Sequence, residues 1–334
     1  MTYINNINYF KIVQNNTTKR VIVLIGEFHN RDDCRAIGVN TPFEIGNLLI
    51  EIAGALPPSQ QHTPHLYIEC PKANPAAITT PSMMFDMCNL SLSYLSNYYT
   101  VDNGIDDRHE FPELVELNSI AIYFPGSTPL DPRNLPIIIN ILRTFKIQYE
   151  TFITMKYNKT IDELMRMPHI HPILSVVYLH FTNLDATLYH YNTGQIDQIN
   201  TLQNIHKDLY PIILSVLDIS ISLRLDKHND FTILYTGSDH CQTMSQYLFN
   251  NTTDWYTLYE GTNVAKNCIT IDIGFVLNII GSLQTPVFAP AQSVFAPRAR
   301  HSFGRRLTAK AAGHSQTAKA APKVKRSPSS RSYR

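Results

Sequence analysis

Two histidines follow strand-like runs in matching contexts. The segment VIVLIGEFHN lies near the N-terminus, and FTILYTGSDH lies more than two hundred residues later. In each, a run of β-forming residues stops at a glycine and a histidine follows three residues on, which gives the pairs Gly26/His29 and Gly237/His240. Open α/β sheets bind ligands at the carboxyl ends of their strands, so the pattern predicts two imidazoles directed into one crevice.

Acidic side chains and one arginine accompany these histidines at predicted strand ends. Two imidazoles with several carboxylates are suited to binding a divalent metal ion or to general acid/base catalysis. An arginine beside them is suited to binding an anionic group or a developing oxyanion. The residues are Glu27 and His29 after the first run, Glu69 at the end of LYIE, Asp106, Asp107, Arg108 and His109 in GIDDRHEF, and Asp239 and His240 after the second run.

Each of these residues also has a structural interpretation. A histidine after a strand is commonly a loop or core residue, Glu69 would cap a strand end, and Arg108 would pair with a neighbouring aspartate on the surface. The chain has no nucleophile elbow, no phosphate-binding glycine loop and no H-E-x-x-H zinc motif. The residue pattern therefore leaves the catalytic and the structural interpretation both open.

Taken together, four segments resemble the erythromycin esterase, ChaN-like and TraB–TIKI hydrolase superfamily, with a large-DNA-virus member as one possibility. They are G-E-F-H after a strand, the acidic strand end LYIECP, the loop GIDDRHEF, and G-S-D-H opening a helix. G-E-F-H is closer to the esterase form than to the G-T-x-H of the TraB–TIKI proteins. The resemblance implies an α/β fold with both Gly-x-x-His turns in one cleft, and a site formed by Glu27, His29, Glu69, Arg108 and His240.

The resemblance implies a hydrolase that cleaves an ester or peptide bond of a small-molecule or peptide substrate. His29 and His240 would flank the scissile carbonyl or a metal-bound water, Glu27 or Glu69 would be the general base, and Arg108 would bind substrate or the oxyanion. A divalent metal ion, if it is the cofactor, would be held by His29, His240 and Glu69. The alternatives are an inactive structural or DNA-packaging virion protein on the same fold, and a haem- or metal-binding protein.

The segments that must position these residues alternate between strand-like and helix-like patterns. This alternation predicts an α/β fold with a mixed or parallel sheet flanked by helices. Residues 135 to 225 are mainly helical in pattern and would cover the sheet or form a helical insertion. Strands are predicted at Val21–Ile25, Leu66–Glu69, Ser119–Phe124, Phe231–Tyr235 and Ile269–Asp272. Helices are predicted over Leu135–Tyr157, Ile205–Leu225 and Cys241–Phe249. Two further helices are predicted to begin at the capping boxes of Thr41 and Thr160.

The spacing of the cysteines and the length of the apolar runs predict the cellular location of the protein. The five cysteines are widely spaced and form no C-x-x-C, which predicts free thiols in a reducing compartment. No apolar run reaches the ~18 to 20 residues of a membrane span, and the N-terminus lacks the pattern of a signal peptide. We therefore expect an intracellular protein, in the cytoplasm or nucleus of a host or packaged in a virion, that is not secreted by a classical signal.

Charge divides the chain near residue 290. Of the 28 Lys and Arg, 11 lie in residues 291–334, which contain no Asp or Glu; 17 remain against 27 acidic residues in residues 1–290. We expect a hydrolase-like domain over 1–290 and a disordered basic tail over 291–334 that binds nucleic acid or an acidic protein. The predicted nucleic-acid contacts are Arg298, Arg300, Arg305, Arg306, Lys310, Lys319, Lys323, Lys325 and Arg326.

Deleting residues 291–334 should abolish retention on DNA and leave the melting temperature nearly unchanged. Binding through many phosphate contacts falls steeply with salt, so retention of the full chain should also weaken as salt is raised. DNA-column retention and thermal unfolding of both chains test this. A large drop in melting temperature would mean that the tail packs on the body.

Overall fold

A computed structural model describes residues 1–27, 34–57, 64–70, 94–113, 117, 131–225, 231–249, 254–265 and 268–283. The chain divides into two units, Met1–Phe288 and Ala289–Arg334, and all of the described residues belong to the first. His29, the predicted strand Ser119–Phe124, the boundary near residue 290 and the basic tail lie outside the described residues and stay predictions.

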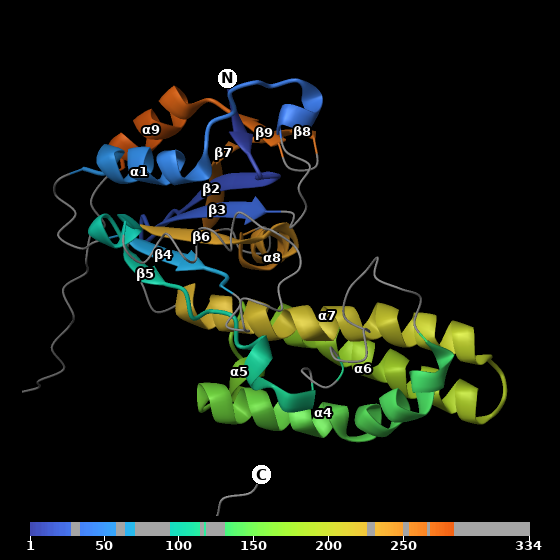
Figure 1. The fold of residues 1–334 in the computed structure, drawn as a ribbon. Coiled ribbons are helices and arrows are strands. Elements are labelled where there is room, and N and C mark those ends of the chain that lie inside the picture. Colours follow the sequence, from blue (N-terminus) through green and yellow to red (C-terminus); the bar gives the residue numbers. More distant parts are fainter. Residues whose placement is uncertain are drawn as a thin grey trace, which may run out of the picture. The chain divides into compact units, whose positions relative to one another are not determined.

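Strands and helices alternate along the described chain as the sequence pattern predicts (Figure 1). The strands are β1 (Thr2–Asn5), β2 (Tyr9–Asn15), β3 (Val21–Glu27), β4 (His65–Ile68), β5 (Thr100–Asp102), β6 (Thr232–Gly237), β7 (Trp255–Glu260), β8 (Thr262–Ala265) and β9 (Cys268–Ile271). The α-helices are α1 (Ile45–Ala55), α4 (Leu135–Tyr157), α5 (Ile161–Met165), α6 (His171–Asn192), α7 (Gln198–Leu225), α8 (Ser238–Met244) and α9 (Ile273–Gly281). Short 3-10 turns are η1 (Cys34–Ile37), η3 (Leu95–Asn97), η4 (Arg108–Glu110) and η5 (Pro132–Asn134), and η6 (Ser245–Phe249) is a π-helical turn.

The main sheet has six strands in the order β5-β4-β6-β3-β2-β7. Strands β5, β4, β6 and β3 are parallel, while β2 pairs antiparallel with both β3 and β7. A smaller antiparallel sheet has the order β1-β9-β8. The predicted α/β fold with a mixed sheet flanked by helices is therefore confirmed.

Helices cover both faces of the main sheet, because its central strands are apolar on both sides. On one face, residues such as Leu24 and Leu234 pack against helices α4, α6, α7 and α8 in a first hydrophobic cluster. On the other face, Ile25 and Ile233 pack against α1 and α9 in a second cluster. Figure 1 shows α1 and α9 on one side of the sheet and α7, with α6 and α4 beyond it, on the other.

The predicted helical insertion is confirmed between β5 and β6, where α4 to α7 follow one another. Helix α4 has the predicted bounds, and Thr160 caps α5 through a reciprocal capping box with Glu163. Helix α7 begins seven residues before the predicted start and continues through Pro211. Within the described residues, no helix combines the length and apolar character needed to cross a membrane.

One predicted helix start is wrong. The sequence predicts a capping box at Thr41, but α1 begins at Ile45 after Glu44, whose side chain makes no capping hydrogen bond. Phe43 instead forms a parallel bridge with Ile4: its amide donates to the Tyr3 carbonyl and its carbonyl accepts from the Asn5 amide. Pairing with β1 holds this segment extended, so a tertiary contact overrides the local helix signal.

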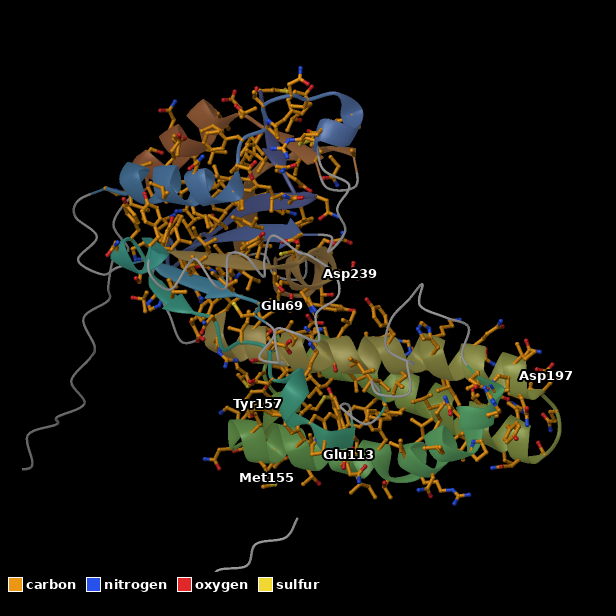
Figure 2. All side chains as sticks on the ribbon, viewed as in Figure 1. Glu69, Glu113, Met155, Tyr157, Asp197 and Asp239 are labelled. Carbon is orange, nitrogen blue, oxygen red and sulfur yellow. A yellow bond between two sulfur atoms is a disulfide. The ribbon has the colours of Figure 1, made fainter. Side chains whose placement is uncertain are left out.

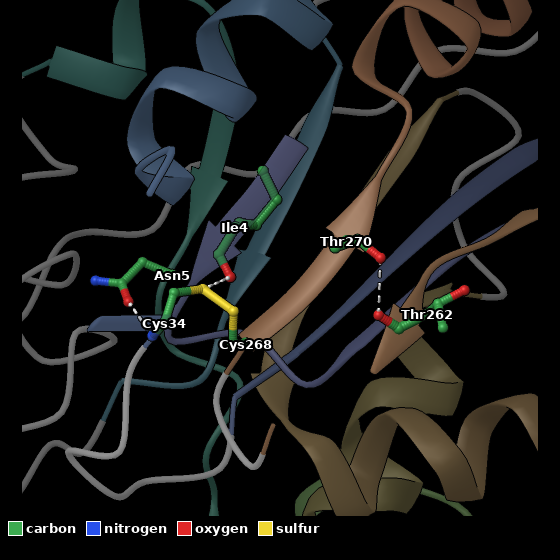
Figure 3. Close-up of a disulfide and its surroundings, with 6 residues drawn as sticks. All are labelled: Ile4, Asn5, Cys34, Thr262, Cys268 and Thr270. Carbon is green, nitrogen blue, oxygen red and sulfur yellow. Dashed lines mark hydrogen bonds between the residues drawn. A yellow bond between two sulfur atoms is a disulfide. The ribbon is translucent and has the colours of Figure 1, made fainter. Parts of the chain in front are cut away.

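The prediction of free thiols is also wrong for three cysteines. Cys34 and Cys268 form a disulfide between η1 and β9, and Cys70 is disulfide-bonded too (Figure 3). Cys241 is a buried free thiol. Cys34 and Cys268 are 234 residues apart in the sequence, and the pairing of β1 with β9 brings them together, which residue spacing alone does not reveal.

Gly26, in the first Gly-x-x-His motif, is required by packing. A Cβ atom at this position would lie 2.8 Å from Ser238 Cα and 2.8 Å from Tyr9 Cβ, closer than real Cβ contacts. Helix α8, which carries the second histidine, therefore sits directly against the end of β3. The glycine allows the two motifs to approach each other.

Replacing Gly26 by alanine should destabilise the fold by about 1 to 3 kcal/mol, because backbone atoms of α8 would have to move. The matched control is Gly54→Ala in α1, where a Cβ would meet no atom within 4 Å. That change should be neutral or stabilising by up to about 1 kcal/mol. Urea unfolding of both variants tests this, and equal stabilities would contradict the packing argument.

Candidate functional site

The polar clusters predicted from the sequence lie at the carboxyl ends of four adjacent parallel strands. Glu27 ends β3, Gly237 ends β6, Glu69 directly follows β4, and the loop with Asp106 follows β5. In the parallel register Glu27 lies beside Gly237, and the Glu69 amide donates to the Tyr235 carbonyl of β6. The topology therefore gathers these segments at one edge of the sheet.

Glu69 is the centre of the hydrogen-bond network at this edge. Its carboxylate is buried, with one oxygen, Oε1, 2.5 Å from Arg108 Nη2. The other oxygen, Oε2, accepts from the Thr236 hydroxyl at 2.5 Å and from the Gly237 amide at 2.8 Å. Figure 2 shows Glu69 between the sheet and α7. Because buried carboxylates need compensating donors, these three contacts explain how the charge is tolerated.

Arg108 is shared between two carboxylates. Its Nε and Nη2 donate to Asp106 Oδ1 and Oδ2 at 2.8 and 2.9 Å, and Nη2 also contacts Glu69. The Arg108 amide donates to Asp106 Oδ1 at 3.1 Å. The fork-like contact of a guanidinium with a carboxylate fixes the side-chain geometry. The pairing of Arg108 with Asp106 is thus found, but inside the site and partly buried rather than on the surface.

His240 is brought to Glu69 from α8 and is held by α7. Its Nδ1 lies 2.6 Å from Asp218 Oδ1, and its Nε2 lies 3.9 Å from Glu69 Oε1. The imidazole is 3% exposed and Asp218 is 4% exposed. A carboxylate on one ring nitrogen fixes the orientation of the ring and directs the other nitrogen to its chemical partner.

Both members of this pair have shifted pKa values. Burial by itself lowers the pKa of the His240 imidazole, but the carboxylates of Asp218 and Glu69 outweigh burial, and the pKa lies above its ordinary value. Complete burial raises the pKa of the Asp218 carboxyl, although His240 acts in the opposite direction. The folded protein therefore binds the proton of His240 more tightly than the unfolded chain does.

A second ionic network, centred on Asp107, anchors the loop after β5 that also carries Arg108. Asp107 is fully buried and accepts from the Ser220 hydroxyl at 2.8 Å and from Tyr157 at 3.2 Å. Lys156 Nζ lies 3.2 Å from Asp107 Oδ1, and Arg224 Nη1 lies 3.6 Å from Oδ2. The adjacent aspartates therefore serve different purposes: Asp106 orients Arg108, and Asp107 fastens the loop to α4 and α7.

Glu27 is buried at the same edge but contacts the opposite face of the sheet. Its Oε2 accepts from the Tyr235 hydroxyl at 2.7 Å, and Tyr235 belongs to the cluster packed against α1 and α9. Thr236, the next residue of β6, instead contacts Glu69. Side chains alternate across a strand, so consecutive residues reach the two acids from opposite sides. The described contacts bring together Glu69, Arg108 and His240, whereas Glu27 has a separate partner.

Asp239 faces a different surface from its neighbour His240. It is exposed, and its Oδ2 accepts from the Tyr210 hydroxyl of α7 at 3.3 Å. Figure 2 shows Asp239 on α8, away from the labelled Glu69. Of the two consecutive residues in G-S-D-H, only the histidine therefore belongs to the buried network among the described contacts.

Sequence reasoning missed Asp218, the partner of His240. A signal exists: Asp218 is the only charged residue between Asp208 and Arg224, in the otherwise apolar and hydroxyl-bearing run LYPIILSVLDISISL. An acid in the middle of a buried helix needs a partner, because an unpaired buried charge is costly. The sequence does not indicate which partner the fold supplies.

The described members of the predicted metal site, Glu69 and His240, already have other partners. Arg108 Nη2 already lies 2.5 Å from Glu69 Oε1, and the Glu69 Oε2 atom accepts from Thr236 and Gly237. Among the residues that the structure describes, no group of three or more His, Cys, Asp or Glu side chains is placed to hold a metal ion. His29 lies outside these residues, so the set of His29, His240 and Glu69 stays a prediction.

The raised pKa of His240 predicts a pH-dependent stability. Stabilisation from a group whose pKa is raised by folding is present below its unfolded value, about 6.5, and is lost as the pH rises through the folded value. The free energy of unfolding should therefore fall as the pH rises above about 6.5 in the native chain, and less so in His240→Gln.

Urea unfolding at a series of pH values tests this. In a second variant, Asp218→Asn, the carboxylate that raises the imidazole pKa is removed, so the fall in stability should be smaller and should end at a lower pH. Identical pH dependence in the native chain and His240→Gln would show that His240 does not titrate in this way.

Comparisons with known proteins identify no relative of this chain. No family model, curated protein or solved structure matches the chain. The superfamily resemblance therefore rests on its four short segments alone, and the function must be argued from the site.

Proposed function

We propose that the protein is a hydrolase acting on an ester or peptide bond, with His240 as the residue that moves a proton. The observation that carries this proposal is the contact of 2.6 Å between Asp218 Oδ1 and His240 Nδ1. A carboxylate that orients an imidazole, and stabilises its charged form, is the arrangement used for proton transfer in many acyl-transfer sites. The substrate would be a small molecule or a peptide.

The pKa direction of His240 supports a role as general acid. A raised pKa favours the protonated imidazole, in which Nε2 carries a hydrogen that it can donate to a leaving group. Once deprotonated, the same nitrogen can accept a proton from water. Asp218 would be a positioning residue, because it contacts His240 and not the reacting atoms.

The contacts of Glu69 and Arg108 favour roles beside those of general base and substrate binding. Arg108 is balanced by Asp106 and Glu69, which favours a role in holding the network over binding an anionic substrate. Glu69 accepts hydrogen bonds on both oxygens, and its negative charge lies 3.9 Å from His240 Nε2. It would stabilise the protonated form of the His240 imidazole. Glu27 and His29 stay candidates for a general base and a second imidazole.

A second candidate is a structural protein on the same fold. It is favoured by the burial of the network: Glu69 is 5% exposed, and Asp218 and His240 are buried as well. Buried polar networks of this kind also specify a unique fold without any reaction. Binding of the basic tail to nucleic acid or an acidic partner, in a host cell or virion, is proposed for both candidates, and a DNA-packaging role belongs to the structural one.

The two candidates predict different responses to His240→Gln. For the hydrolase, turnover per folded molecule should fall on the order of 10²- to 10⁴-fold, the usual contribution of a general acid. Asp218→Asn should reduce turnover less and shift its pH profile to lower pH. A panel of neutral esters and peptides, assayed across pH, with folded protein quantified by circular dichroism, provides the measurement.

The matched control is Asp208→Asn. Asp208 Oδ1 lies 2.8 Å from His180 Nδ1 in a second carboxylate–imidazole pair between α7 and α6. This change should lower stability and leave turnover per folded molecule intact. Unfolding of His240→Gln with unchanged turnover, or no hydrolysis by the native chain of any substrate in the panel, would favour the structural protein.

A further inference from the structure

The Cys34–Cys268 disulfide joins two elements of the smaller sheet region. Cys268 opens β9 and is paired in register with Asn5 of β1, while Cys34 opens η1. Both residues are fully buried, and their Cα atoms are 4.8 Å apart. Figure 3 shows the bond beside β1, with Thr270 and Thr262 marking the other side of β9. The bond closes a very long chain loop, which restricts the unfolded state strongly.

Contacts around Cys34 remain available when the bond is broken. The Cys34 amide donates to the Asn5 side-chain oxygen at 3.2 Å, and Cys34 Sγ lies 3.2 Å from the Ile4 carbonyl oxygen. Figure 3 draws both contacts as dashed lines. A thiol at Cys34 has an acceptor for its hydrogen within reach, so reduction does not leave this thiol as an unsatisfied buried donor.

Backbone pairing also keeps Cys268 in place after reduction. Four residue pairs align β1 with β9, and β8 pairs with the other side of β9. These ladders do not depend on the sulfur atoms. Two thiols that stay near each other re-form their bond readily, because the second step of thiol–disulfide exchange is intramolecular.

We propose that Cys34 and Cys268 form a reversible redox switch that sets the local stability of the smaller sheet and η1. Oxidised, the bond holds β1, β9 and η1 together; reduced, these elements open more often, while α6 and α7 on the far side of the main sheet are unaffected. The inference is independent of the proposed hydrolase activity, since it concerns local stability.

The chemistry is two-electron thiol–disulfide exchange with a small thiol as reductant. A thiolate attacks one sulfur, the S–S bond breaks, and a mixed disulfide forms while the other sulfur leaves as thiolate. A second reductant thiol displaces the protein sulfur from the mixed disulfide. The products are two protein thiols, which receive the two protons of the reductant, and one oxidised reductant disulfide.

Hydrogen exchange on the full chain, with and without dithiothreitol, tests the switch. Reduction should lower amide protection in β1, β9 and η1 on the order of 10- to 1000-fold, with α6 and α7 unchanged, and oxidised glutathione should restore it. Peptide mapping with a thiol-blocking reagent would confirm which cysteines react in each state.

Two variants separate this bond from the other cysteines. Cys34→Ser with Cys268→Ser should show the reduced pattern in β1 and β9 and no further change on adding dithiothreitol, even though Cys70 is then reduced. Cys241→Ser should respond as the native chain does. Free Cys34 and Cys268 thiols without reductant, unchanged protection on reduction, unfolding that includes α6 and α7, or failure to recover on oxidation would each overturn the proposal.

Discussion

The candidate site depends on keeping the Glu69 carboxylate charged inside the protein. Removing an ionised carboxylate from water is costly unless nearby donors replace the lost hydration. Three groups provide these donors: the Arg108 guanidinium from the loop after β5, and the Thr236 hydroxyl and Gly237 amide from the end of β6. Glu69 thereby ties the end of β4 to the end of β6 and to the loop after β5. Without it, three neighbouring segments would lose their common partner.

Helix α7 completes the arrangement from one face of the sheet. Asp218 reaches His240, and Ser220 and Arg224 reach Asp107 in the loop after β5. One long helix thus contacts two acidic networks and packs its apolar residues on the sheet between them. Since the Asp106–Asp107 pair lies between both networks, a shift of this loop would disturb Arg108 and the helix contacts together. The two networks are therefore coupled through this loop.

Much of the framework was predictable from the sequence, because local patterns determine it. The apolar run from Val21, the helix Leu135–Tyr157 and the capping box at Thr160 all appear where the residues indicate them. The rule that residues following parallel strands gather at one edge of the sheet also identified Glu69, Arg108 and His240, which the structure brings together. These predictions succeed because they need only propensity, periodicity and the direction of parallel strands.

What the sequence missed depends on contacts between distant segments. The sequence around Asp218 does not predict that His240 is its partner, and the sequence around Cys34 does not predict its disulfide with Cys268. The extended conformation of Phe43 likewise comes from β1, against a local helix signal. Glu27 was correctly placed at a strand end, but the pleat directs it to Tyr235, because side-chain alternation depends on the strand's exact register.

The pairing of β1 with β9 has a consequence for how the chain is made. The first strand, Thr2–Asn5, bridges to nearby Phe43 but pairs along its whole length with Cys268–Ile271, near the end of the described chain. During synthesis the N-terminal strand must therefore remain without its β9 partner until Cys268–Ile271 has left the ribosome. Such distant pairings slow folding, since loop closure precedes the gain from contact. Assembly of the smaller sheet is thus a late event, and chains interrupted before β9 would expose the unpaired edge of β1.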